Sequence, residues 1–461
     1  MLQYESAPLV VFDGPDELGL VVARRFSATF GASYVIIDGL GVGLSIPLYG
    51  QEGGWDGRSV ESFAVGDLRF EASWAFVRLP FLDVAVLGDA WLPTSTQDTF
   101  TGERRPRASL GMAAQGSLGP LIVGAAYLEL ADLSRLLPRP QLNQPTDRVS
   151  LLFPHRYGGV GLTYQRRAWI AGAAMRARPW LGVGVSAGIA QVSLGEIRHV
   201  WAGFAGREPL GDPGRDLVLS LGGSDAAVPM VSAGALIAPP PLPLEIALSM
   251  SYAAAAELGG AARLSATRDT TFPTPELTNP RAEAVLPGSV VLRAGMRYLG
   301  ERVLIETGGD ITLYTGDSPL WTVSGVSVRD STGATGTLGR VPSLVDRRAH
   351  GALRAAIDVE AVRGFVWLTA GYAYRTGSSR TAYLTPAHAD PAGHIVAVGA
   401  EGQWSTMVFT IGYSRMLETA ITVDASNVEL INPFDGGTAP VGAGTYDGAV
   451  DMFGAGIDIT W

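Results

Sequence analysis

The stretch from Leu244 to Tyr252 reads LEIALSMSY, and it decides the fold class. Its large apolar residues alternate with glutamate, alanine and serine, so an extended chain would have one apolar side and one small, polar side. A helix would scatter these residues around its cylinder, because its side chains repeat every ~3.6 residues and not every two. The stretch therefore predicts a β-strand with two unlike faces.

The same alternation recurs along the chain, at 40–48, 68–76, 290–298 and 407–413. The second face of these segments is mostly glycine, serine, alanine and threonine, whereas the outer face of a soluble β-sandwich is usually richer in lysine and glutamate. Many segments are longer than the five or six residues of a common strand and suit a tilted membrane strand of ~9–11 residues. We therefore predict one domain over 1–461, a closed antiparallel transmembrane β-barrel, with a soluble all-β protein as the alternative.

Composition excludes several functional classes. Charged residues make up 17% of the 461 residues, against ~25% in an average protein, and glycine contributes 59. The mean hydropathy is +0.21, yet no run of about eighteen apolar residues predicts a membrane helix. Cysteine and lysine are both absent, which removes disulfides, thiolate metal sites and lysine nucleophiles. A net charge of −10 argues against a nucleic-acid partner.

The last strand sharpens the prediction, because it alternates cleanly and ends on tryptophan. Such a closing strand looks like the signal that the barrel assembly machinery of Gram-negative outer membranes recognises, and we assign it to Phe453, Ile457, Ile459 and Trp461. The surroundings would then be outer-membrane lipid and lipopolysaccharide. Trp169, Trp180 and Trp404 stand beside predicted short turns, where an interfacial aromatic girdle belongs. No signal peptide is present in this sequence, so we expect that it was removed or omitted.

Connection lengths predict the topology. Short turns at 38–39, at 299–301 and around Trp404 would join strands into hairpins. Long polar connections lie near 50–63, 94–104, 132–156, 193–226, 268–286, 316–346, 377–391 and 418–446. Short periplasmic turns alternating with long extracellular loops are typical of outer-membrane barrels. Eight hairpins between strands near 5–12 and 447–461 predict about eighteen strands; because 157–192 could hold two or three, an even number from ~14 to ~20 is expected.

The C-terminal third resembles the FadL/TodX (OMPP1) family of outer-membrane transporters. The resemblance spans roughly 284–461 and is carried by the stretches AVLPGSV at 284–290, GMRY at 295–298, TAGYAY at 369–374 and GHIVAVG at 393–399. It implies passive transport of small hydrophobic molecules, of the long-chain fatty acid or aromatic hydrocarbon class. The family's N-terminal hatch motif is not found here, nor is a C-terminal periplasmic domain. A general porin for hydrophilic solutes and a structural or anchoring barrel remain alternatives, and the oligomeric state is open.

Charged residues recur on the small, polar face of the predicted strands. In a barrel that face lines the lumen, which gives a set of predicted lumen residues: Arg69, Glu71, Glu245, Arg293, Arg297, Glu306, Asp310, Arg375, Glu401 and Asp458. We expect these charged side chains to pair with one another in a hydrated network, and favour this over a site that recognises a substrate. Arginine and carboxylate neutralise each other locally, so no ion preference follows.

One predicted loop is unusually apolar. Leu133, Leu136 and Leu137 stand at helical spacing after Asp132, a residue type that caps helices. In the FadL family, loop helices form a hydrophobic capture groove, so the resemblance implies that these leucines bind substrate. A short helix that only packs against its own loop is the alternative.

Signals of catalysis and of metal binding are weak. The string GVSAG at 184–188 matches a nucleophile motif, but it continues an alternating strand and lacks the required strand-to-helix turn. The five histidines, His155, His199, His350, His388 and His394, are dispersed. We therefore expect no enzyme activity, no metal and no cofactor.

Overall fold

The computed structural model describes most of the chain. The described residues are 2–13, 16–55, 58–59, 62–94, 107–118, 120–136, 159, 161–201, 216–266, 274–317, 319–329, 335–345, 347–381, 384, 390–405, 407–424, 426, 444–446 and 448–459. Within these ranges every long regular element is a β-strand. No helix in the described part of the chain is long and apolar enough to cross a membrane.

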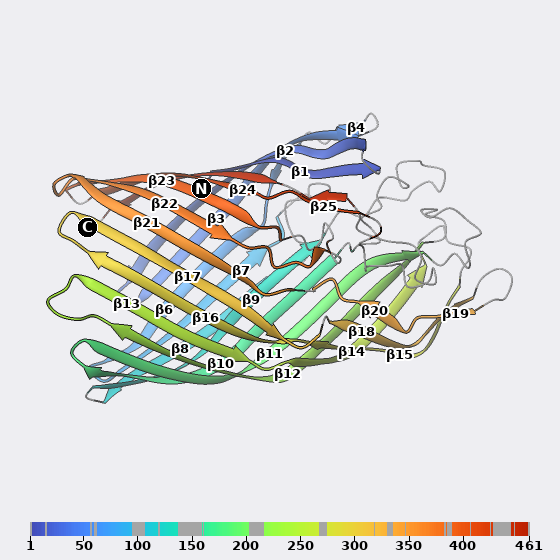
Figure 1. The fold of residues 1–461 in the computed structure, drawn as a ribbon, viewed down its shortest axis with the longest axis horizontal. Helices are drawn as coiled ribbons and strands as arrows, with labels where there is room; N and C mark the ends of the chain where they lie inside the picture. The colour runs from blue at the N-terminus through green and yellow to red at the C-terminus, as the bar shows by residue number, and fades with distance from the viewer. Residues whose placement is uncertain are drawn as a thin grey trace.

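The strands follow one another as antiparallel hairpins (Figure 1). Their bounds are β1 Leu2–Asp13, β2 Asp16–Ile37, β3 Leu40–Trp55, β4 Arg58–Ser59, β5 Ser62–Val65, β6 Leu68–Leu79, β7 Leu82–Leu92, β8 Arg107–Leu118, β9 Leu121–Leu136, β10 Gly161–Arg178, β11 Leu181–Trp201, β12 Asp216–Ile237, β13 Leu244–Ala253, β14 Ala256–Ala266, β15 Thr274–Leu286, β16 Gly288–Leu299, β17 Val303–Thr315, β18 Leu320–Arg329, β19 Thr335–Thr337, β20 Arg340–Pro342, β21 His350–Val362, β22 Val366–Arg375, β23 Gly393–Trp404, β24 Met407–Glu418, β25 Ile421–Val423, β26 Gly444–Tyr446 and β27 Ala449–Ile459.

Twenty-five of these strands join one large antiparallel sheet, an arrangement consistent with a β-barrel. Most neighbours in sequence are neighbours in the sheet, as in β6–β7, β10–β11 and β23–β24. The first strand also pairs with the last, through five residue pairs from Leu2↔Phe453 to Ser6↔Ala449. Among the described residues, Thr29–Ile37 of β2 and Gly454–Ile459 of β27 have a strand partner on one side only.

The short turns gather at one end of the sheet, at the left in Figure 1, near the C terminus. The predicted turns at 38–39 and 299–301 and beside Trp404 are confirmed. Gly39 has φ +89°, a conformation that only glycine adopts without strain. A Cβ there would also lie 2.8 Å from the Ala75 carbonyl oxygen, so the tight turn requires this glycine.

At the opposite end, β12 changes its partner. Its Met230–Ile237 half pairs with β13, and its Leu217–Ser224 half pairs with β14. The Asp225 carboxylate stabilises the change of partner by accepting the Ala227 and Glu257 N–H groups, each at 2.9 Å. From β14 the pairing continues through β15 and β18 to β19 and β20. We call β14, β15 and β18–β20, with the adjoining ends of β10–β12, the loop-end sheet.

The loop-end sheet corrects several predicted loops. The connections predicted near 193–226, 268–286 and 316–346 contain much of β11, β12, β15 and β18–β20. These stretches contain many glycine and charged residues, which suggested loops. In the structure, residues of both kinds lie within the strands of the sheet. The region 157–192 holds two strands, not three. The loop-end sheet also encloses an apolar core that includes Leu194, Leu219, Leu258, Trp321 and Leu344.

Candidate functional site

The strands near the short turns have two unlike faces. One face, which we call the apolar face, exposes large hydrophobic side chains, among them Leu248, Leu292, Ile311, Leu353, Val398 and Ile411. Leu353 is 67% exposed and Ile411 66%. Soluble monomers rarely expose a continuous apolar surface of this size, so the face requires an apolar environment. The opposite face carries the predicted charged residues, and we call it the polar face.

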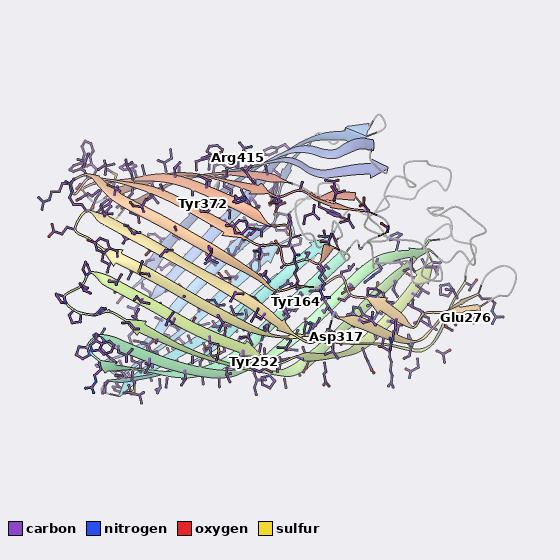
Figure 2. The ribbon with its side chains drawn as sticks, viewed as in Figure 1. Tyr164, Tyr252, Glu276, Asp317, Tyr372 and Arg415 are labelled. Carbon is purple, nitrogen blue, oxygen red and sulfur yellow. The ribbon has the colours of Figure 1, made fainter. Side chains whose placement is uncertain are left out.

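Aromatic residues border the apolar face at two levels. Trp404 and Phe365 lie beside the short turns, with ring centroids 6.5 Å apart. Trp169 packs against Tyr127 at 4.7 Å, but it stands nine residues before the end of β10 and not beside a turn as predicted. Nine strand residues span about 30 Å, which suits a tilted strand crossing an apolar band ~25 Å tall. Tyr372 lies along β22 in Figure 2, where its hydroxyl is 2.8 Å from His394 Nδ1.

A hollow of about 760 Å³ also lies on the apolar face. It spans β12, β13, β16, β17 and β21, and its lining is almost wholly apolar: Ala233, Ala235, Leu248, Met250, Leu292, Ala294, Ile311 and Leu353 contribute. Its lining also includes Arg293 and Asp310, so the hollow adjoins charged residues of the polar face.

The first charged cluster of the polar face lies on β6 and β7. The Arg69 guanidinium forms ion pairs with Glu71 at 2.8 Å and with Asp89 at 3.0 Å. It also lies over the Trp91 ring, 5.2 Å from the centroid. Ser109 donates a hydrogen bond to Asp89 at 3.0 Å. Each charge of this cluster therefore has a partner.

A second cluster lies across β13, β16, β17 and β21. Glu245, Arg297 and Glu306 stand directly opposite one another on three adjacent strands, and Arg297 pairs with Glu245 at 2.6 Å and Glu306 at 3.7 Å. Arg354, which the sequence reasoning did not single out, pairs with Asp310 at 2.6 Å. The residue directly opposite Asp310 on β16 is Arg293, which instead donates to the Ser251 hydroxyl at 3.3 Å.

The remaining predicted lumen residues are distributed among the C-terminal strands. Arg375 pairs with Asp390 at 2.8 Å and Glu418 at 3.0 Å. Glu401 lies on β23 opposite Thr410 of β24. Asp458 lies on β27, opposite Val408 of β24. Asp89, Arg354 and Glu418 were missed because their partners lie on other strands, which the sequence does not align.

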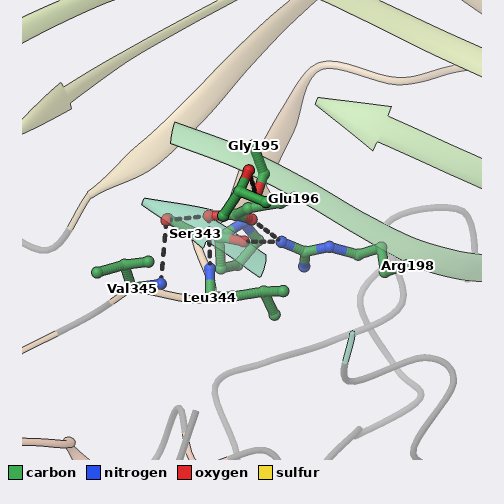
Figure 3. Close-up of polar contacts among 8 residues, drawn as sticks. Gly195, Glu196, Arg198, Ser343, Leu344 and Val345 are labelled. Carbon is green, nitrogen blue, oxygen red and sulfur yellow. Dashed lines mark hydrogen bonds and ion pairs between the residues drawn. The ribbon is translucent and has the colours of Figure 1, made fainter. Parts of the chain in front are cut away.

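The loop-end sheet holds a buried ion pair (Figure 3). Arg198 donates to Glu196 at 2.7 Å, and both side chains on β11 are no more than 2% exposed. The Glu196 carboxylate also accepts the Leu344 N–H at 3.0 Å and the Ser343 hydroxyl. Burial lowers the pKa of Arg198 from its ordinary value, and the adjacent Glu196 carboxylate opposes that shift. No local sequence pattern marks this cluster, because Glu196 and Ser343 are 147 residues apart in the chain.

The predicted helical turn at Leu133–Leu137 is wrong for the residues that the structure describes. Leu133 and Leu136 belong to β9, where they pair with Tyr164 and Gly161 of β10. Long-range strand pairing overrides the local helical spacing. Leu137 lies outside the described residues. The binding role of the three leucines stays a prediction.

The closing strand is confirmed as a strand, β27, which pairs with both β24 and β1. Phe453 packs against Tyr413 with ring centroids 4.7 Å apart, while Ile457 and Ile459 pair with Phe409 and Met407. Trp461 lies outside the described residues. The assembly role of these residues stays a prediction.

The weak catalytic and metal signals can also be located. Ser186 lies within β11, where its hydroxyl oxygen is 2.6 Å from that of Ser232. His350 and His394 lie on separate strands, β21 and β23. No group of three metal-ligating side chains occurs in the described part of the chain. His155 and His388 lie outside it.

Comparison with known proteins adds the fold relationship. No family model matches the chain, and no curated protein matches it. Among solved structures, a Pseudomonas aeruginosa FadL homologue is 12% identical, with a TM-score of 0.50 over 77% of this chain and 79% of the homologue. The Pseudomonas putida toluene transporter TodX is 14% identical, with a TM-score of 0.45 over 84% of this chain and 88% of TodX. An anion-selective porin from Comamonas acidovorans is 9% identical, with a TM-score of 0.32 over 95% of this chain and 100% of the porin. The likeness to the FadL homologue shows a FadL-like fold.

Proposed function

We propose that the chain is a closed outer-membrane β-barrel that carries small hydrophobic molecules passively across that membrane. Followed from neighbour to neighbour, the pairing passes through eighteen wall strands and returns to its start: β1–β3, β6–β13, β16, β17, β21–β24 and β27. In this barrel the apolar face contacts lipid and the polar face lines the lumen. The short turns would be periplasmic and the loop-end sheet extracellular.

The observation that carries the choice of solute is the loop-end core. On β11 one face is continuous from Gly182 to Val200, and at its loop end this inward face is filled by packed apolar side chains. A general porin needs a wide, hydrated passage, whereas here the inward face supports a packed core. The charges of the polar face also pair with one another, which leaves little net electrostatic field for attracting ions. Both features favour a hydrophobic solute, of the class that the family resemblance implies.

Planar-bilayer recording separates the two transport functions. We expect the purified protein to be nearly silent in potassium chloride, because the loop-end core narrows the water-filled path. A large, steady open channel would favour the porin and contradict the proposal. A parallel assay follows entry of N-phenylnaphthylamine, a small aromatic probe, into intact cells with and without the protein.

Leu133→Ser with Leu136→Ser tests the proposed capture residues in that assay, and unaltered heat-modifiable gel migration would show that the variant still folds.

A further inference from the structure

The segment from Pro342 to Val345 begins at the last residue of β20 and lies against β11; we call it the strap. Its start is fixed to the loop-end sheet, because Pro342 pairs with Leu320 of β18 and the Ser343 N–H donates to the Pro319 carbonyl at 3.1 Å. Its Leu344 side chain packs closely on Gly159, where a Cβ would lie 2.5 Å from Leu344 Cδ1. The strap is almost entirely buried, with Val345 only 7% exposed.

Polar contacts hold the strap to β11. The Glu196 carboxylate accepts both the Ser343 hydroxyl and the Leu344 N–H, and Arg198 donates to the Pro342 carbonyl at 2.7 Å. Figure 3 shows Ser343, Leu344 and Arg198 all contacting Glu196. Glu196 lies on the same face of β11 as Gly182 and Ser186, the face that is inward in the proposed barrel.

The chain beyond the strap is tied to a different part of the wall. The Arg348 N–H donates to the Ser378 carbonyl at 2.7 Å, and its Nε donates to Gly377 at 3.1 Å. Arg347 forms a β-bridge with Ser379. These residues adjoin β21 and β22, which the pairing order separates from β11 by β12, β13, β16 and β17. The strap and its continuation therefore connect two separated parts of the wall at the loop end.

We propose that the strap is a lid over the loop end of the lumen and that the Glu196 carboxylate is the latch that holds it shut. A buried ion pair contributes little net stability, because desolvation offsets its Coulombic attraction, but it fixes the position of the groups around it. The latch carboxylate accepts two of the three hydrogen bonds that join the strap to β11, and the third runs from Arg198 to the Pro342 carbonyl. Removing that carboxylate leaves the strap hydroxyl and N–H without their acceptor and makes opening easier.

Thiol labelling tests the latch without reference to any solute. The chain has no cysteine, so Val345→Cys creates a single buried thiol, and cysteine packs as a small apolar side chain in place of the buried valine. We expect a membrane-impermeant maleimide to label this thiol at least ten times faster when Glu196→Ala is added. The control is Glu276→Ala, which breaks an exposed 2.7 Å pair with Arg329 in the same loop-end sheet and should leave the rate unchanged (Figure 2). Equal labelling with and without Glu196 would overturn the latch.

Planar-bilayer current in potassium chloride tests the lid, which rests on the proposed barrel. Glu196→Ala should raise the mean current at least fivefold over the wild type. Faster labelling with unchanged current would show that the strap does not cover a passage, and would overturn the lid. If the single variant fails to assemble, Glu196→Leu with Arg198→Met leaves no buried charge and serves the same two measurements. A wild type that already conducts steadily would contradict both the lid and the proposed function, whereas failed uptake of the aromatic probe would contradict only the function.

Discussion

Ile411→Arg is expected to lower the free energy of unfolding by about 2–4 kcal/mol in lipid, the cost of an arginine near the bilayer midplane on the lipid face of a barrel. Ile411 is 66% exposed on the apolar face of β24. The adjacent variant Thr410→Arg provides a matched control, because Thr410 lies on the polar face directly opposite Glu401. It should change the unfolding free energy by no more than about 0.5 kcal/mol.

Urea titration of the protein folded into lipid vesicles measures both variants. In the proposed barrel the apolar face contacts lipid and the polar face lines the lumen, so arginine at these two neighbouring positions should have different effects on the unfolding free energy. Equal destabilisation by Ile411→Arg and Thr410→Arg would show that the faces are not distinguished in this way.

Glu196→Ala is expected to destabilise the fold by about 3–5 kcal/mol, because it leaves Arg198 buried without a counter-charge. The double variant Glu196→Leu with Arg198→Met should be close to neutral, since it removes both charges and keeps apolar volume in the core. The same urea titration gives both values. A double variant as unstable as the single one would mean that the ion pair itself, and not the stranded arginine, supports the loop-end sheet.

The strands were predictable wherever one face meets an apolar environment. Leu244–Tyr252 shows this directly: its alternation is the pattern that β13 uses, with Leu248 and Met250 exposed on the apolar face. The same logic located β16, β24 and β27. Period two is readable there because each strand has one side that is apolar over most of its length, with Arg415 of β24 and Asp451 of β27 as exceptions.

The loop-end sheet was not predictable in the same way. Gly222, Gly223 and Asp225 suggest a loop, yet Asp225 stabilises the point where β12 changes partner. The leucines at 133 and 136 have helical spacing, but pairing with β10 decides their conformation. The latch was hidden for a related reason, because Glu196 meets Ser343 across 147 residues of chain. Contacts of this length depend on strand order, which local patterns do not encode.

Disulfide formation between the first and last strands tests barrel closure, the central claim, most directly. Gln3 of β1 stands opposite Met452 of β27, and opposed antiparallel residues have Cα atoms about 4.5–5.5 Å apart, within the range of a disulfide. Ser414 lies in the same row one strand further, roughly 10 Å from Gln3. In a chain with no other cysteine, Gln3→Cys with Met452→Cys should oxidise to one intramolecular disulfide, while Gln3→Cys with Ser414→Cys keeps two free thiols. If both pairs stay equally reduced in the folded protein, the first strand does not close on the last.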